Sequence, residues 1–411
     1  MRLAVLPLPK IAVLAASLLL TATLPCRGAE VATANDTARF LAGMQPSANS
    51  PLASLTDDPA WQHHARFLDA AFAQLDRHQL SKIRAWASVN LAAPRQTMFY
   101  MFSGPDFLYA NAFYSKASTY VLSALEPPGS VPDLARLPRG SVDAALYNVE
   151  RSLSSILTFS FFITNQMKVD LRTSEVSGTL PILYVFLARS GKTIRSVTPV
   201  ALDGKGALIV GSEAHGRITA RGIRIIFSGN DAVDRTLYYF STDLSNSSVR
   251  VSGFLKFCDT LAPGNSLVKS ASYLLHARNF STVRDWLLAH SATIIQDDSG
   301  IPLADYNRRA WRFFPFGRYL GPISKFPERY QPQYAELFAH APPLDFGIGY
   351  RWRAHESNLL LAVKVARDVP AFTASASADE VVPRRSEWRR RPRPPTVFEP
   401  PPPRGFFWFG R

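Results

Sequence analysis

Thr97–Asp106, TMFYMFSGPD, and Gly222–Asp231, GIRIIFSGND, are two apolar runs with the same ending: Phe-Ser-Gly, one variable residue and Asp. Such a run, stopped by Gly and Pro or Asn, is typical of a buried strand where the chain leaves a sheet. The glycine tolerates positive φ, and the aspartate can hydrogen-bond to its own backbone in the following turn. Folds often present ligand-binding groups at strand ends, so Asp106 and Asp231 are the first candidate catalytic residues. We expect both aspartates to lie at a common edge of the sheet.

The rest of the chain mixes helical and strand patterns. Helical spacing begins at Asp58-Pro59 and recurs at 141–157, 180–188, 266–278 and 281–290. Strand patterns with hairpin turns cover 194–242, and Asp345–Arg353 alternates apolar with small or cationic residues before a second apolar run at 359–365. These patterns predict one large α/β domain of the α+β-like kind over 58–370, with a mixed, largely antiparallel sheet covered by helices.

The amino-terminal residues 1–34 have the features of a signal peptide. Arg2 and Lys10 precede the apolar stretch Ile11–Leu24, and small residues follow, so cleavage is expected after Gly28 or Ala34. The stretch is shorter than the roughly 20 residues that a membrane-spanning helix needs. We therefore predict an exported protein, periplasmic or secreted, with a flexible lead-in at 35–57. Cleavage leaves Cys258 as the sole cysteine, and its apolar neighbours indicate a buried, inert thiol.

The carboxyl-terminal residues 371–411 lack hydrophobic periodicity and are rich in proline and arginine. A composition of this kind cannot form a core, so we expect a disordered tail with an aromatic tip, Gly405–Arg411. Eight arginines against two glutamates in 381–411 supply +6 of the net charge of +14. Because the excess charge is concentrated here, we expect contact with an anionic envelope surface or membrane interface, and no nucleic-acid binding. A loose hydrophobic tip without a partner is the alternative.

Familiar catalytic motifs are missing from the sequence. It contains no HExxH, GxSxG, Rossmann glycine fingerprint or CxxC pair. Ser266-x-x-Lys269 has the spacing of a serine–lysine nucleophile motif, but no Lys-Thr-Gly follows on a later strand. We predict no metal site, and the sequence names no cofactor.

Carboxylates at predicted strand ends are the remaining candidates for catalysis: Asp106, Asp231 and Asp298. Asp297 precedes Asp298, and neighbours on a strand face opposite sides, so only one of this pair is expected in a given site. Candidate ligand-binding residues are Tyr109 in an aromatic cluster, Arg351 and Arg353 beside small residues, and His215 in a loop. Two functions follow. The first is an exported ligand- or envelope-binding protein with a basic tether; the second is a hydrolase or transferase with Asp106 as the leading residue.

Overall fold

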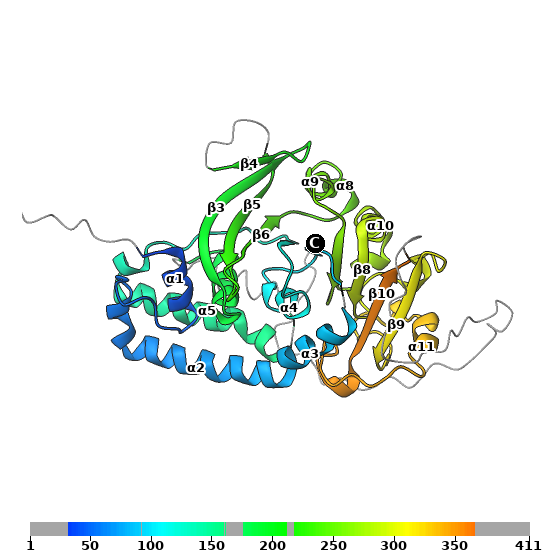
Figure 1. The fold of residues 1–411 in the computed structure, drawn as a ribbon, viewed down its shortest axis with the longest axis horizontal. Helices are drawn as coiled ribbons and strands as arrows, with labels where there is room; N and C mark the ends of the chain where they lie inside the picture. The colour runs from blue at the N-terminus through cyan, green and yellow to red at the C-terminus, as the bar shows by residue number, and fades with distance from the viewer. Residues whose placement is uncertain (1–31, 92, 160, 162–175, 212–217, 366–411) are drawn as a thin grey trace, which may run out of the picture. The chain divides into compact units, whose positions relative to one another are not determined.

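The computed structural model describes residues 32–91, 93–159, 161, 176–211 and 218–365, which form one mixed α/β domain (Figure 1). Its ten-stranded sheet has the order β4-β3-β5-β6-β2-β1-β7-β8-β10-β9. The strands are β1 Thr97–Tyr100, β2 Thr119–Ala124, β3 Thr193–Asp203, β4 Leu208–Val210, β5 Ile218–Ser228, β6 Asp234–Ser241, β7 Gly264–Val268, β8 Ser291–Gln296, β9 Trp311–Gly317 and β10 Asn358–Lys364. The five central strands, β6-β2-β1-β7-β8, are parallel, and every pairing outside them is antiparallel. The predicted fold class, with a mixed and largely antiparallel sheet, is confirmed.

Helices cover both faces of this sheet. They are α1 Ala34–Leu41, α2 Pro59–Leu75, α3 Ser81–Asn90, α4 Phe107–Phe113, α5 Arg139–Phe159, α7 Leu180–Arg189, α8 Asn246–Val249, α9 Phe254–Asp259, α10 Ser281–His290 and α11 Pro332–Leu337. Asp58 caps α2 as predicted, its side chain accepting from the Ala60 amide at 2.9 Å. Among the described residues, no helix combines the length and the apolar character needed to cross a membrane.

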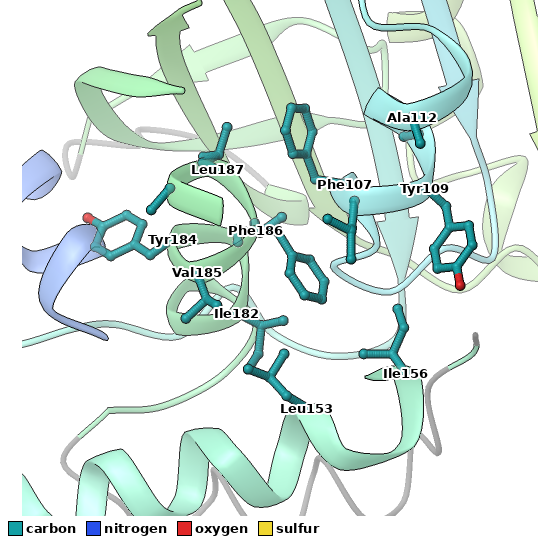
Figure 2. Packing of buried hydrophobic residues seen from close by; sticks show 14 of the residues in the cluster. Phe107, Tyr109, Ala112, Leu153, Ile156, Ile182, Tyr184, Val185, Phe186 and Leu187 are labelled. Atoms are coloured by element: carbon teal, nitrogen blue, oxygen red, sulfur yellow. The ribbon is translucent and has the colours of Figure 1, made fainter. Parts of the chain in front are cut away.

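Successive strand residues point to opposite faces, so the sheet separates two cores. In β1, Met98 and Tyr100 belong to the first core, and Phe99 belongs to the second. The first core is covered by α1, α2, α3, α4, α5 and α7, whereas the second is covered by α8, α9, α10 and α11. Figure 2 shows side chains of α5 and α7, including Ile156 and Phe186, lying against α4 in the first core.

The connections around β1 and β7 run on opposite faces. From β1 the chain crosses to β2 through α4, in the first core, whereas from β7 it crosses to β8 through α10, in the second core. Neighbouring strands whose crossovers leave on opposite faces define a topological switch point, where open α/β sheets commonly bind ligands at the carboxyl ends of the strands. This fold has its switch point between β1 and β7.

Three local predictions are wrong. The segment 35–57 is no flexible lead-in, because α1 buries Phe40 and Leu41 in the first core. Residues 266–278 do not form a helix: 264–268 is the parallel strand β7, since its pairing with β1 and β8 overrides a weak helical pattern.

The third concerns 345–353, which is a loop with one isolated bridge, Ile348 to Arg351. Its Gly349 has φ +67° and passes directly over Asp297, so the backbone bends away from a strand conformation. β10 therefore pairs with β8 and β9.

Candidate functional site at the carboxyl edge of β1, β7 and β8

A cluster of buried charged and phenolic side chains lies at the switch point. We call it the carboxyl-edge cluster, and its members are Tyr100, Asp106, Tyr109, Lys269, Tyr273, Asp297, Asp298 and Tyr350. Asp106, Lys269, Asp297 and Asp298 are each at most 3% exposed. Buried charges are costly unless they are paired and hydrogen-bonded, so the contacts of each charge need to be accounted for.

Strand register brings three of these residues to one face. Tyr100 follows Met98 by two positions, Lys269 follows Leu267, and Asp297 follows Ile295, and the three preceding residues all lie in the first core. Leu267 is paired with Ile295, which places Lys269 beside Asp297 at the end of the ladder. The alternation of strand residues therefore directs Tyr100, Lys269 and Asp297 to the same side of three strands.

Asp106 is the centre of the first half of the cluster. Its Oδ1 accepts from the Tyr109 amide at 3.1 Å and so caps α4, while its Oδ2 accepts from the Tyr100 hydroxyl at 3.0 Å. The Lys269 ammonium lies 2.8 Å from the same Oδ2 and 3.4 Å from the centre of the Tyr109 ring. Burial lowers the pKa of Lys269, and the Asp106 carboxylate opposes that effect. Asp106 is thus held by a backbone amide, a phenol and an ammonium.

The second half of the cluster contains the paired acids. Asp297 Oδ1 accepts from the Ser299 hydroxyl at 2.6 Å, and its Oδ2 accepts from the amides of Ser270 and Tyr350 at 3.3 and 3.4 Å. Asp298 instead accepts from the Tyr273 hydroxyl at 2.6 Å and from the Asn358 amide group at 3.0 Å. The adjacent acids bind different partners, but both belong to the cluster, so the expectation that only one of the pair joins a given site is wrong: both lie beyond the end of β8, where the alternation of strand residues no longer separates them.

The environment of these acids favours a retained proton. Burial, and then the charge of Asp298, raise the pKa of Asp297 to about 7, and burial also raises the pKa of Asp298. With Asp106, Asp297 and Asp298 ionised against Lys269 and Arg351, the formal charge of this region is one negative charge. A single proton shared by the paired acids makes it neutral.

Backbone strain is concentrated here. Ser270, Ser272 and Tyr273 have φ of 54°, 54° and 55°, in the left-handed region that side chains rarely occupy. Each such residue costs energy that the surrounding structure must offset, and residues of this kind gather at functional sites. Ser270, Ser272 and Tyr350 are half-buried, so the cluster comes closest to solvent on this side.

Asp231 is remote from this cluster. β5 runs antiparallel to β6, and β6 is parallel to β2 and β1, so the turn that holds Asp231 lies at the amino edge of the parallel strands. Its carboxylate accepts from the Arg235 guanidinium at 2.9 Å, and this bond holds the pKa of Asp231 below its ordinary value. The expectation that the two FSGxD aspartates share an edge is wrong because the two strands run in opposite directions.

The predicted ligand-binding residues are separated as well. Tyr109 is buried against Lys269, and Arg351 is buried and donates to the carbonyls of Gly321 and Pro322. Arg353 lies over the Trp352 ring and donates to Glu356 instead, so the two arginines do not face one ligand. His215 lies outside the described residues.

Sequence reasoning missed Lys269 and the serines and tyrosine that follow it. The signal was weak: only Leu267 and Val268 are apolar in Gly264–Val268, and the polar residues Lys269 and Ser270 follow them, as Ser103 follows the longer apolar run before FSGPD. Cys258 behaves as predicted, since it is a free, buried thiol whose pKa is raised by burial.

Within the described part of the chain, no group of three or more His, Cys, Asp or Glu side chains is arranged to hold a metal ion. No protein-family model, curated protein or solved structure matches this chain. The site must therefore be interpreted from its own chemistry.

Proposed function

We propose that this is an exported ligand-binding protein whose site is the carboxyl-edge cluster. The observation that carries the proposal is the coincidence of buried ionisable groups and strained backbone with the switch point between β1 and β7. Ionisable residues with perturbed pKa values concentrate at functional sites, and open sheets bind ligands at this position.

The charge of the cluster indicates the class of ligand. When the neighbouring Arg351 is counted with the cluster and the paired acids hold one proton, the charges balance, so a charged ligand would bring an uncompensated charge into a buried site. Tyr273 and Tyr350 add stacked aromatic faces, with ring centroids 6.5 Å apart. A small, neutral, polar molecule with hydrogen-bonding groups and an apolar or ring face suits this combination.

A thermal-shift screen of the exported chain tests the proposal. Neutral sugars, polyols, nucleosides and esters are compared with nucleotides, amino acids and divalent cations. A ligand at about 100 times its Kd stabilises the folded state by about 2.7 kcal/mol, a readily measured rise in Tm. We expect a neutral ligand to give the rise.

Two variants make the screen specific to the site. Asp106→Asn is expected to abolish the rise, measured from its own baseline, whereas Asp231→Asn retains it. Asp231 is a matched control, because it ends the same FSGxD sequence at the opposite edge of the strands. A rise that survives Asp106→Asn unchanged, or a panel without any neutral ligand, would refute the proposal.

The second candidate function is a hydrolase or transferase, and the state of Asp297 favours it. A group with a pKa of about 7 is suited to accept and return protons near neutral pH. In this alternative Asp297 replaces Asp106 as the leading catalytic group, because the Asp106 carboxylate is paired with the Lys269 ammonium at 2.8 Å, whereas the pKa of Asp297 is raised to about 7.

Export and the tail complete the proposal. Thr33 caps α1, with its Oγ1 accepting from the Asp36 amide at 3.0 Å, so signal cleavage after Gly28 keeps this cap and cleavage after Ala34 removes it. We therefore favour Gly28. The segment 381–411 lies outside the described residues, and its composition supports a tether to an anionic envelope surface.

A further inference from the structure

We propose that Ser270 is the nucleophile of an acyl-ester hydrolase and that Asp297 is its general base. This inference rests on the ligand site proposed above and names its reaction. Ser270 lies two residues beyond Val268, the last residue of β7, at the switch point, and its amide donates to Asp297 Oδ2 at 3.3 Å. The carboxylate and the serine are therefore tied to one another by the backbone.

The hydroxyl of Ser270 is distinctive among the serines of this region. Its Oγ is buried and makes no hydrogen bond within the described part of the chain. The hydroxyl of Ser272 lies 2.5 Å from that of Tyr350, and Ser266 and Ser299 are bonded to Ser291 and Asp297. A buried hydroxyl without a partner loses about 1–3 kcal/mol, so its retention requires an explanation. A role toward a bound substrate supplies one.

The backbone of Ser270 is held in a strained conformation by this same cluster. The φ of 54° persists because Asp297 binds the Ser270 amide and the Tyr350 hydroxyl donates to the Ser270 carbonyl at 3.1 Å. A strained turn at the end of a strand is a known way to present a nucleophilic serine beside its base. The raised pKa of Asp297 supports the role of base at neutral pH.

The reaction balances with water as the only co-reactant. Ser270 Oγ bonds to the carbonyl carbon of a neutral ester while its proton passes to the Asp297 carboxylate. The bond from the carbonyl carbon to the alcohol oxygen then breaks, and the alcohol leaves with that proton. In the second half of the reaction, water gives a proton to the Asp297 carboxylate, and the water oxygen bonds to the acyl carbon. Ser270 Oγ leaves and recovers the proton, so ester and water yield carboxylic acid and alcohol.

An alkyl fluorophosphonate probe and short-chain p-nitrophenyl esters test this inference on the exported chain. We expect one covalent adduct, located by peptide mass spectrometry on Ser270. Ser270→Gly should fold, because glycine relieves the positive φ, and should lose both labelling and hydrolysis. Asp297→Asn should slow both by about 100-fold or more.

Ser266→Ala is the matched control. Ser266 is a buried serine of β7 four residues before Ser270, but its hydroxyl is already bonded to that of Ser291, so this variant should label at a rate within about threefold of the wild type. Absence of an adduct on wild-type Ser270, or full hydrolysis by Ser270→Gly, would overturn the inference. If a neutral ligand still raises Tm in that case, and Asp106→Asn abolishes the rise, the binding function stands and only the serine assignment fails.

Discussion

Removing the Asp297 carboxyl should change how the stability of the protein depends on pH. In the folded state its pKa is about 7, against an ordinary 3.8, because burial and the charge of Asp298 disfavour the carboxylate. Between these two values the folded protein holds a proton that the unfolded chain has released. The free energy of unfolding contributed by Asp297 is therefore fully present below about pH 4 and is lost as pH rises through about 7. A displacement of this size corresponds to about 4 kcal/mol.

His276 opposes this trend over part of the same range. Burial, and then the charge of Arg329, lower the pKa of His276 from 6.5 to about 4. Between those values the unfolded chain holds the extra proton, so the contribution of His276 to stability rises with pH, by about 3 kcal/mol. The contributions of these two groups therefore largely cancel up to about pH 6.5, and only a difference between variants isolates Asp297.

The assay is urea unfolding followed by tryptophan fluorescence between about pH 4.5 and 8, for the wild type, Asp297→Asn and His276→Gln. Asp297→Asn loses hydrogen bonds at every pH, which gives a constant offset. Its unfolding free energy minus that of the wild type should rise by about 3 kcal/mol over this range. The same difference for His276→Gln should fall with pH and level off near pH 6.5. A change below about 1 kcal/mol for Asp297→Asn, or a change in the other direction, would refute the reasoning.

Three further outcomes are expected. A Cβ added at Gly349 would clash with the Asp297 carboxylate oxygen Oδ2, whereas Gly191 has the same φ of +67° and open space around it. In urea unfolding, Gly349→Ala should therefore destabilise the protein by well beyond the about 1–2 kcal/mol expected for Gly191→Ala. Equal costs for the two variants would contradict the packing described. Lys269→Met leaves the buried carboxylate of Asp106 without its cation and should lower the free energy of unfolding by about 3–5 kcal/mol. A double-mutant cycle with Asp106→Asn should show strong coupling, and additive effects would argue against the ion pair. Deleting 381–411 should leave Tm within about 1 °C and reduce binding to anionic vesicles; unchanged vesicle binding would remove the tether.

Much of the fold was predictable from local patterns. The Asp58 cap of α2, the β3–β4 and β5–β6 hairpins, and the helices α7 and α10 were all expected near their observed positions. Errors occurred where long-range pairing overrode a local pattern. The segment 345–353 alternates in sequence like a strand, but it forms a loop in which Gly349 packs against Asp297. The segment of β7 has a helical spacing, but five of its residues pair with β8 and hold it as a strand.

The site was predictable only in part. Asp106, Asp297 and Asp298 were identified as strand-end acids, but Lys269 and Ser270 were not, because their segment was interpreted as a helix. Which side chains meet across neighbouring strands depends on the order of the strands in the sheet, and the residue pattern of a single strand does not specify that order.

The sequence by itself determined that two apolar runs end in FSGxD, that acids follow predicted strands, and that the domain mixes helices with strands. Only the tertiary structure decided that the two aspartates lie at opposite edges, since local patterns do not specify whether a strand runs parallel or antiparallel to its neighbour. It also decided that Lys269 is paired with Asp106 and that the pKa of Asp297 is raised to about 7. Both depend on burial and on charges brought together from segments far apart in the chain.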